Sequence, residues 1–564
     1  MRRFAATLAT LALVLLFATG AARALNMRRP HCTDSPCGAT WPTRTPTPTS
    51  IAFPSRSPSV DLPGGGAGSD FNGDGFADLA AGVPRENVDG VRDAGGVNVL
   101  YGSSSGLQGA GSQLWHEGST GVPGEPSASD LFGFSLAVGD LDGDGYADLA
   151  IGSPFEDAGP ATNAGALVVL YGSPLGLGAD QAQRFDQDTV DVPDVVEEGD
   201  QFAYALAVGD LDTDGFSELV IGVQREDLPN SDGIERGNAG AVQVLRGSAA
   251  GVTAVGSTLV SQSTDGVPGE AERGDEMGST IASADLNGDG SEDIVAGAPY
   301  EEVDGASSAG AAYVIPGSAA GIQPTMATVW DQTTAGIADK PEVGDLFSWA
   351  LTTGDLNGDG NDDLVIGAHG ELISGHPRAG AVHVLPGGPD GPTVSDATFW
   401  HQGSVDVPGT VGTEDAFGKA VAAGDLNGDG NDDLAIGARY DDEAGVPGAG
   451  AVNVLYGGVA GVSSAGAQLW TQTSTDSGET SEEKDHFGSI LAIAPLQGAT
   501  QDSLAIGAHF ESWGGSRHQG ALHVLAGGTE GITSSDSQLW TQDSPGVRER
   551  SDSNDFFPFA LAAD

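Results

Sequence analysis

The sequence predicts an all-β protein, a seven-bladed β-propeller that is closed by its own C-terminal strand. One observation is a repeat of about 70 residues, in which each copy carries an acidic, glycine-rich motif such as DLNGDGNDDLAIG at 425–437. A second is that each copy holds four short apolar runs with the alternation and β-branched residues typical of strands. Seven repeats of four strands are the make-up of a β-propeller. The motif begins at Asp70, Asp140, Asp210, Asp285, Asp355 and Asp425, with a degenerate copy at Pro495.

The two ends of the chain divide one repeat between them. The other motifs follow a strand of the kind seen as FGFSLAVG at 132–139, but the first motif is preceded by DLPGGGAG at 61–68. A strand of this kind, FFPFALAAD, comes last, at 556–564, after the seventh repeat. We expect it to pair beside the N-terminal motif, because that pairing closes the ring and leaves no exposed sheet edge.

The first 65 residues are predicted to lie outside the propeller. Residues 1–24 have the features of a secretory signal peptide, with Arg2 and Arg3, an uncharged apolar stretch and the cleavage site Ala22-Arg23-Ala24. Residues 25–65 are rich in Pro, Thr and Ser, which predicts an extended linker, and the propeller is expected over 66–564. No other segment is long and apolar enough to span a membrane. We therefore expect the mature chain to be secreted or at the cell surface, without a membrane span.

The charge of the chain limits its partners. It has 80 Asp and Glu residues against 22 Lys and Arg, a formal net charge of −58. Because nucleic-acid phosphates require a basic face, this charge argues against a nucleic-acid partner and equally against anionic membranes. It favours cations or a basic partner, although a well-solvated acidic surface would also produce it.

The acidic motif predicts calcium binding. Calcium takes six to eight oxygen ligands, which positions 1, 3, 5, 7 (through its carbonyl) and 9 of a tight loop can provide. Asx turns favour the same residues, but they do not require a fourth carboxylate at a constant position. An EF-hand would continue into a helix with Glu at position 12, where the sixth copy has Ile436. We therefore expect about six structural Ca²⁺ ions.

The expected ligands follow directly from the spacing. The seventh copy has Pro495, Gln497, Ala499 and Ser503 at the ligand positions and is expected to bind no ion. Glu218, a longer side chain at position 9, leaves it open whether the third loop holds calcium. The full set is Asp70, Asn72, Asp74, Phe76 and Asp78; Asp140, Asp142, Asp144, Tyr146 and Asp148; Asp210, Asp212, Asp214, Phe216 and Glu218; Asp285, Asn287, Asp289, Ser291 and Asp293; Asp355, Asn357, Asp359, Asn361 and Asp363; Asp425, Asn427, Asp429, Asn431 and Asp433.

The repeats resemble the FG-GAP repeats of integrin α-subunit propellers. Phe132-Gly133 and Phe417-Gly418 match the FG element, and Gly297-Ala298-Pro299 matches GAP. The resemblance covers about residues 66–564 and implies calcium loops between the first and second strands of blades. It does not imply integrin function, because one fold serves many activities. The P of GAP is replaced by Gln224, His369, Arg439 and His509, and the G of FG by Ala203, Ser348 and Pro558.

A second set of acids stands two residues past each GAP position. In a four-stranded blade these acids lie on the face opposite the calcium loops, where the resemblance to integrins places ligand contacts. They are candidates for binding a ligand, while an acid present in every blade is also explained by pairing between blades. The set is Glu86, Glu156, Glu226, Glu301, Glu371, Asp441 and Glu511.

The sequence favours a binding protein over an enzyme. It contains no H-E-x-x-H motif and no phosphate loop, and its two cysteines lie in the predicted linker. We therefore expect an exported, calcium-binding propeller that acts in binding or adhesion, with an unknown protein or carbohydrate ligand. The alternative is a carbohydrate-active hydrolase or lyase with carboxylates in the central opening. A structural surface component is a third possibility.

Overall fold

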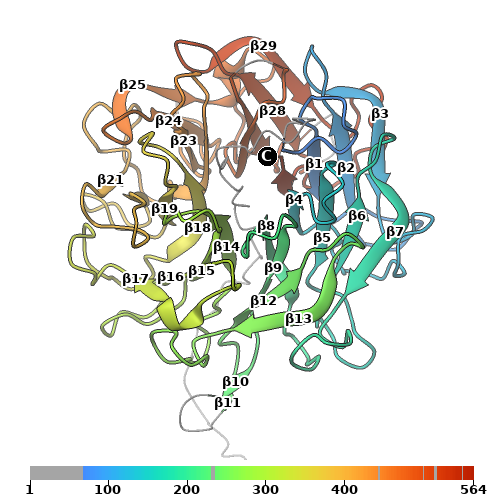
Figure 1. Ribbon diagram of the computed structural model, residues 1–564. Helices are drawn as coiled ribbons and strands as arrows, with labels where there is room; N and C mark the ends of the chain where they lie inside the picture. The colour runs from blue at the N-terminus through green and yellow to red at the C-terminus, as the bar shows by residue number, and fades with distance from the viewer. Residues whose placement is uncertain are drawn as a thin grey trace, which may run out of the picture. The chain divides into compact units, whose positions relative to one another are not determined.

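The computed structural model describes residues 68–229, 235–442, 445–498, 501–512, 517–548 and 550–563. Over these residues it forms seven four-stranded antiparallel sheets arranged in a ring (Figure 1). Short 3-10 turns occur at Pro324–Met326 and Gln472–Thr475. The predicted seven-bladed propeller is therefore confirmed, while the expected signal peptide and linker lie outside the described residues.

Each blade is a meander whose first strand lies nearest the axis and whose fourth strand lies at the rim (Figure 1). The blades after the first are, in chain order, β4 (Ser135–Gly139), β5 (Asp148–Ser153), β6 (Ala166–Tyr171) and β7 (Gly178–Phe185); β8 (Phe202–Gly209), β9 (Glu218–Val223), β12 (Ala241–Arg246) and β13 (Thr253–Val260); β14 (Thr280–Ala284), β15 (Asp293–Ala298), β16 (Ala311–Ile315) and β17 (Thr328–Trp330); β18 (Phe347–Gly354), β19 (Asp363–Ala368), β20 (Ala381–Leu385) and β21 (Thr398–Trp400); β22 (Phe417–Gly424), β23 (Asp433–Ala438), β24 (Ala451–Tyr456) and β25 (Ser463–Trp470); β26 (Ile490–Ala494), β27 (Ser503–Ala508), β28 (Ala521–Ala526) and β29 (Thr533–Trp540). Two short strands of two residues each, β10 (Leu228–Pro229) and β11 (Glu235–Arg236), pair with each other between β9 and β12 of the third blade.

The first blade is built from both ends of the chain. It consists of β1 (Leu79–Val83), β2 (Gly96–Tyr101) and β3 (Gln108–Trp115), with β30 (Ala560–Ala562) as its innermost strand. Ala81 of β1 faces Leu561 of β30 in the antiparallel register. The innermost strands contact one another in the ring order β4, β8, β14, β18, β22, β26, β30 and back to β4. Closure by the C-terminal strand is therefore confirmed.

Repeated residues hold neighbouring blades together. Phe132, at the start of the second blade, is fully buried, and its amide donates a hydrogen bond of 3.0 Å to the carbonyl of Ala94 in the first. Gly95 must be glycine there: its φ is +91°, and a Cβ would stand 2.3 Å from the Phe132 carbonyl oxygen. The same contact joins Phe557 to Gln519, so the last blade is attached to the first in the same way.

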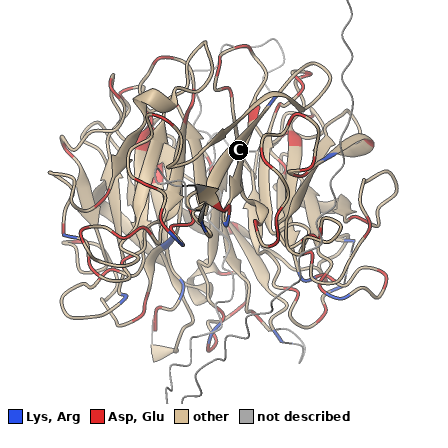
Figure 2. Cartoon of the chain, turned by 90° about the horizontal axis from the view of Figure 1, so that it is seen from below, with Lys and Arg blue, Asp and Glu red and all other residues tan. Residues whose placement is uncertain are grey.

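The two ends of the propeller carry different loops. Because the sheets are meanders, the acidic motifs between the first and second strands lie at one end. The turns after the second strand lie at the other end, with the connections to the next blade. Figure 2 shows Asp and Glu spread over the loops, with few Lys and Arg. In the described ranges no helix has the length and hydropathy of a membrane span.

Candidate functional site

The first aspartate of each acidic loop organises the turn. Asp70 Oδ1 accepts hydrogen bonds from the amides of Gly73 (2.6 Å) and Asp74 (3.1 Å), and Oδ2 accepts one from Gly75 (2.7 Å). Its carbonyl accepts a further bond of 3.1 Å from Ala147, in the loop of the next blade. A loop held in place by an ion would therefore also hold its neighbour.

The carboxylate at position 9 connects the loop to the outer part of the blade. Asp78 Oδ1 accepts the amide of Gly102 at 2.7 Å, and Asp148, Asp293, Asp363 and Asp433 make the same bond in their blades. Position 9 thus has a structural role in addition to any metal, which is not apparent from the sequence. Burial raises the pKa of Asp78 and Asp148 to about 8. A bound cation would remove the reason for these carboxyls to hold a proton.

The oxygens of two loops converge closely enough for one ion. Ligand atoms of Asp140, Asp142 and Asp148 lie within 4.8 Å of one another, as do those of Asp210, Asp212 and Glu218. Two oxygens on opposite sides of a calcium ion stand about 4.6–5.2 Å apart, since each bond is about 2.3–2.6 Å. In the third loop, the buried Oδ1 atoms of Asp210 and Asp212 and Oε1 of Glu218 accept no hydrogen bond from the described residues. These residues fit a calcium ion.

The other four intact loops carry asparagine at position 3, namely Asn72, Asn287, Asn357 and Asn427. Asn287 Nδ2 donates to Asp293 Oδ1 at 3.0 Å, and Asn357 and Asn427 make the equivalent bond. Rotation of the asparagine amide about its Cβ–Cγ bond would place its Oδ1 where its Nδ2 lies. These loops therefore hold their carboxylates together with an internal donor, whereas the second and third loops, with Asp at position 3, have none. The seventh loop lies partly outside the described residues.

Arg246 is a residue of the third loop site that the spacing analysis missed. Its Nη1 lies 3.1 Å from Asp212 Oδ2. In the first, second and sixth blades a tyrosine occupies this position, and Tyr101 and Tyr171 each accept an amide from the next blade. The sequence signal for this residue was an arginine at a position where three other blades have tyrosine. The guanidinium would compete with a cation for one ligand of this loop.

Six of the seven acids of the opposite face join neighbouring blades to one another. In each of them a glutamine from the preceding blade donates its side-chain amide to the carboxylate, for example Gln187 to Glu226 at 2.6 Å and Gln332 to Glu371 at 2.7 Å. Gln542 donates to Glu86 at 2.7 Å, which joins the last blade to the first. The other glutamine pairs are Gln262 with Glu301, Gln402 with Asp441 and Gln472 with Glu511.

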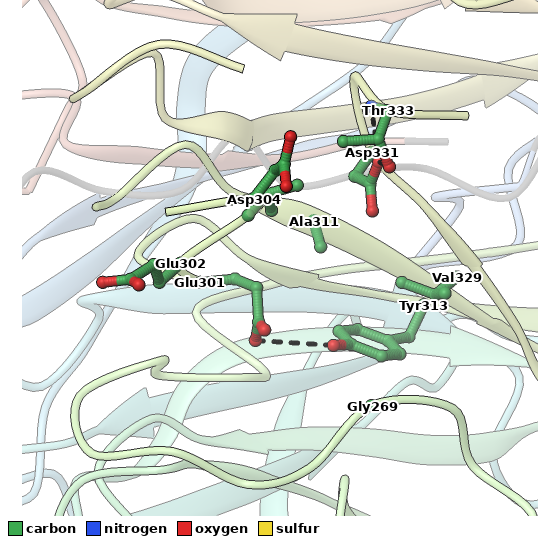
Figure 3. A pocket seen from close by; sticks show the side chains of 10 residues that line it. Gly269, Glu301, Glu302, Asp304, Ala311, Tyr313, Val329, Asp331 and Thr333 are labelled. Carbon is green, nitrogen blue, oxygen red and sulfur yellow. Dashed lines mark hydrogen bonds between the residues drawn. The ribbon is translucent and has the colours of Figure 1, made fainter. Parts of the chain in front are cut away.

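One of these acids borders a pocket. Glu301 lines a cavity of about 470 Å³ together with Glu302, Asp304, Asp331 and Tyr313 (Figure 3). The Tyr313 hydroxyl donates to Glu301 Oε2 at 3.5 Å, the dashed line in Figure 3, and Gln262 donates to the same carboxylate. Burial, followed by the charge of Asp275, raises the pKa of Glu301 to about 8. The pocket is strongly acidic.

The remaining acid, Glu156, has a different partner. Where the other blades supply glutamine, the first supplies Glu117, and Glu117, Asp130 and Glu156 bring carboxylate oxygens within 4.8 Å of one another. All three are buried. Burial, followed by the charge of Asp130, raises the pKa of Glu117 to about 7. Glu117 and Asp130 were not among the predicted site residues, although a glutamate in a column of glutamines was visible in the sequence.

A cationic and aromatic cluster lies on the inner strands of the fifth and sixth blades and in the turns after their second strands, at the end opposite the acidic loops. Lys419 Nζ stands 3.2 Å from His369 Nε2 and 4.3 Å from the centroid of the Trp349 ring. The Arg439 guanidinium lies 4.6 Å from the Tyr440 ring centroid. Lys419 is 7% exposed and Arg439 5%. Burial, together with the charge of Arg439, lowers the pKa of Lys419 well below its usual range.

This cluster has donors without acceptors. Arg439 Nε and Nη1 and Trp349 Nε1 are buried and donate no hydrogen bond within the described residues. A buried cation without a counter-ion is unfavourable, so an anionic group bound here would find charge and hydrogen bonds already in place.

Comparison with known proteins agrees with this architecture. A family model for the FG-GAP repeat matches residues 63–100, 132–170, 202–245, 277–315, 347–385 and 417–455. The chain is an FG-GAP repeat protein.

Relatives of this FG-GAP chain have several activities. It is 33% identical over 254 residues to integrin alpha pat-2 of Caenorhabditis briggsae, covering 42% of this chain and 18% of that protein. It is 32% identical over 176 residues to phosphatidylinositol-glycan-specific phospholipase D of Rattus norvegicus, covering 30% of this chain and 20% of the relative. The matched part thus spans a fifth or less of each relative. The exotype rhamnogalacturonan lyase YesX overlaps 87% of this chain and 92% of its own, with 13% identity and a TM-score of 0.31, too low to bear on activity.

The FG and GAP elements meet across each blade boundary. Gly82 of the first GAP element packs against Gly133 of the next FG element so closely that a Cβ on Gly82 would stand 2.1 Å from the Gly133 carbonyl oxygen. His369 and Arg439 replace the proline of GAP, and Lys419 follows an FG pair. Two members of the cationic and aromatic cluster, His369 and Arg439, are therefore departures from the FG-GAP pattern, which is the signal that could have found it.

Proposed function

We propose that this FG-GAP protein is an exported, calcium-stabilised binding or adhesion protein. Its six intact acidic loops hold structural Ca²⁺, and the end of the propeller opposite those loops binds the ligand. The observation that carries the calcium assignment is the third loop, where Asp210, Asp212 and Glu218 aim three unpartnered buried oxygens at one place. The similarity to an integrin alpha subunit and to a phosphatidylinositol-glycan-specific phospholipase D supports export.

Calcium in these loops acts on stability rather than on chemistry. Each loop uses its acids on one ion, and it joins the inner strand of a blade to the second strand. An ion that binds only the folded chain contributes RT ln(1 + [L]/Kd), about 1.4 kcal/mol per site at ten times Kd. Six sites therefore contribute up to about 8 kcal/mol, comparable with the whole stability of a domain.

The ligand is proposed to place an anionic group between the fifth and sixth blades. Lys419 and Arg439 supply the positive charge, and the half-buried rings of Trp349 and Tyr440 flank them. A carboxylate takes hydrogen bonds from a guanidinium and an ammonium together, and flat ring faces suit the apolar side of a saccharide or side chain. The ring acids contribute to this face through their glutamine pairs, which fix the blades relative to each other.

The calcium proposal is tested by counting ions and measuring unfolding of the full chain. We expect about six calcium ions per chain after equilibrium dialysis, and a large, reversible loss of thermal stability in chelator. One or two ions, or equal stability with and without chelator, would contradict the proposal.

The binding proposal is tested by calorimetric titration with a uronic acid oligosaccharide and with a neutral oligosaccharide of the same length. We expect binding of the anionic probe alone, and loss of at least tenfold in affinity in Lys419→Met and Arg439→Met. Lys484→Met, which removes a charge that is 68% exposed in the side chain, is the matched control and should bind as the wild type does. Equal binding of both probes would refute the anionic site, and shortening of the probe would indicate the carbohydrate-active alternative.

A further inference from the structure

The junction between the first and second blades differs from the other six in one side chain. At those six, the residue that follows the fourth strand by two positions is a glutamine whose amide donates to the carboxylate of the next blade. At the first junction this residue is Glu117, which follows β3. The change replaces a hydrogen-bond donor by a carboxylate that faces another carboxylate.

Among the described residues, the carboxylates at this junction outnumber the cationic groups in contact with them. Glu117 is 4% exposed, and its Oε2 accepts no hydrogen bond from any described residue; the same holds for Glu156 Oε2. Asp130, 2% exposed, accepts the Ser127 amide at 2.7 Å. Arg184 is the cation in contact: its Nη2 lies 3.4 Å from Glu156 Oε1, and its Nη1 lies 2.5 Å from Asp186. One guanidinium thus serves two of four carboxylates.

The backbone of the loop after Glu117 packs close to its carboxylate. Gly124, with φ of +116°, passes so close to Glu117 that a Cβ there would stand 2.6 Å from Oε1. The Glu117 carboxylate is therefore covered on one side by the backbone of Gly124. The oxygens of Glu117, Asp130 and Glu156 lie within 4.8 Å of one another, a spacing that oxygens about 2.4 Å from a shared ion can adopt.

We propose that Glu117, Asp130 and Glu156 bind one hard divalent cation, with calcium as the first probe, and that this ion joins the first blade to the second. An all-oxygen, all-carboxylate set selects calcium, magnesium or manganese over softer metals. The site lies at the end of the propeller opposite the six loops and does not depend on them. At the other junctions the glutamine amide performs the joining role.

Two similar clusters show why the glutamine matters. Glu342, Asp345 and Glu371 come equally close, as do Glu482, Asp485 and Glu511. In each of them a glutamine already donates to the central acid, Gln332 at 2.7 Å and Gln472 at 2.5 Å, and Glu482 is exposed to solvent. We expect no ion at these two junctions.

The test is the change Glu117→Gln in the full chain. The variant is expected to fold, because glutamine is the residue that the other six junctions use. Calcium is counted per chain by equilibrium dialysis and atomic emission for the wild type, for Glu117→Gln and for Glu371→Gln, the same change at a junction that has its glutamine. We expect the first variant to bind one ion fewer than the wild type and the second to bind the same number.

Equal ion counts in the wild type and Glu117→Gln would overturn the proposal, whatever number the acidic loops hold. Loss of one ion in Glu371→Gln as well would also overturn it, because the effect would then not be particular to this junction. Asp130→Asn provides a second measurement: its side-chain oxygen can still accept the Ser127 amide, so a folded variant is expected, again with one ion fewer. The difference between variants is independent of the loops, so failure of the structural calcium sites would be seen separately.

Discussion

Glu371→Gln should make the stability of the propeller less dependent on pH. Glu371 is fully buried, and burial, followed by the charges of Asp345 and Asp339, raises its pKa from the ordinary 4.5 to about 8. A carboxyl whose pKa is raised on folding imposes no penalty below pH 4.5, and its destabilising effect grows as pH rises through the folded pKa. At about 1.4 kcal/mol per pH unit, the interval from 4.5 to 8 corresponds to a penalty of up to about 5 kcal/mol.

The substitution removes this penalty and keeps the contact. The Gln332 amide, 2.7 Å from Glu371 Oε2, can donate to a glutamine oxygen in the same place. Because neighbouring carboxylates share the effect, we expect about half of the limiting value, about 2–3 kcal/mol of added stability at pH 8 and little change at pH 5. The assay is urea unfolding in saturating calcium at both pH values, with the exposed Glu530→Gln as control. An equal effect of Glu371→Gln at pH 5 and pH 8 would refute the reasoning.

Three further changes test the loops, the closure and the blade contacts. Arg246→Gln should raise the calcium affinity of the third loop about fivefold, because a partly exposed ion pair is worth about 1 kcal/mol; an unchanged calcium titration would contradict the competition. Leu561→Ala should lower the free energy of unfolding by about 2–5 kcal/mol, since this fully buried side chain belongs to the closing strand. Gly165→Ala should cost more than about 3 kcal/mol, because its φ is +89° and the new Cβ would meet the Phe202 carbonyl oxygen at 2.3 Å; urea unfolding checks both.

The repeat made the fold predictable from one sequence. A motif that recurs about every 70 residues gives the number of strands, the number of blades and the positions of the loops together. Agreement between the copies supports each of these assignments. Closure was also predictable, because the first acidic motif lacks the strand that precedes the other motifs, and a strand of that kind comes last, after the seventh repeat. The hairpin β10–β11 was not predicted, since it lies in an insertion that the other blades lack and so had no second copy to support it.

The candidate sites were predictable only where they repeat. The loop aspartates were predictable because six copies of the motif keep them at the same positions, but the bond from Asp78 to the Gly102 amide joins residues that are 24 apart in the chain. The glutamine partners of the ring acids were missed for the same reason: Gln187 and Glu226 are 39 residues apart in the chain, and only the docking of two blades brings them together. The spacing of residues in the sequence therefore predicts contacts within one loop, but not contacts between residues of two blades.

The repeat also separates residues that serve the fold from residues that serve a site. A contact that recurs around the ring, such as the glutamine pair made by six of the seven ring acids, is explained by the need to join blades. A residue that breaks the column has no such explanation and must be accounted for by its own surroundings. Glu117 breaks a column of glutamines, while Arg439 stands where the GAP pattern has proline. Within the described residues, the first leaves buried oxygens without donors and the second leaves buried donors without acceptors. Glu117 is acidic and lacks a hydrogen-bond donor, whereas Arg439 is basic and lacks acceptors, among the described residues. A cation at the first and an anion at the second therefore follow from one argument, applied to two positions of the same ring.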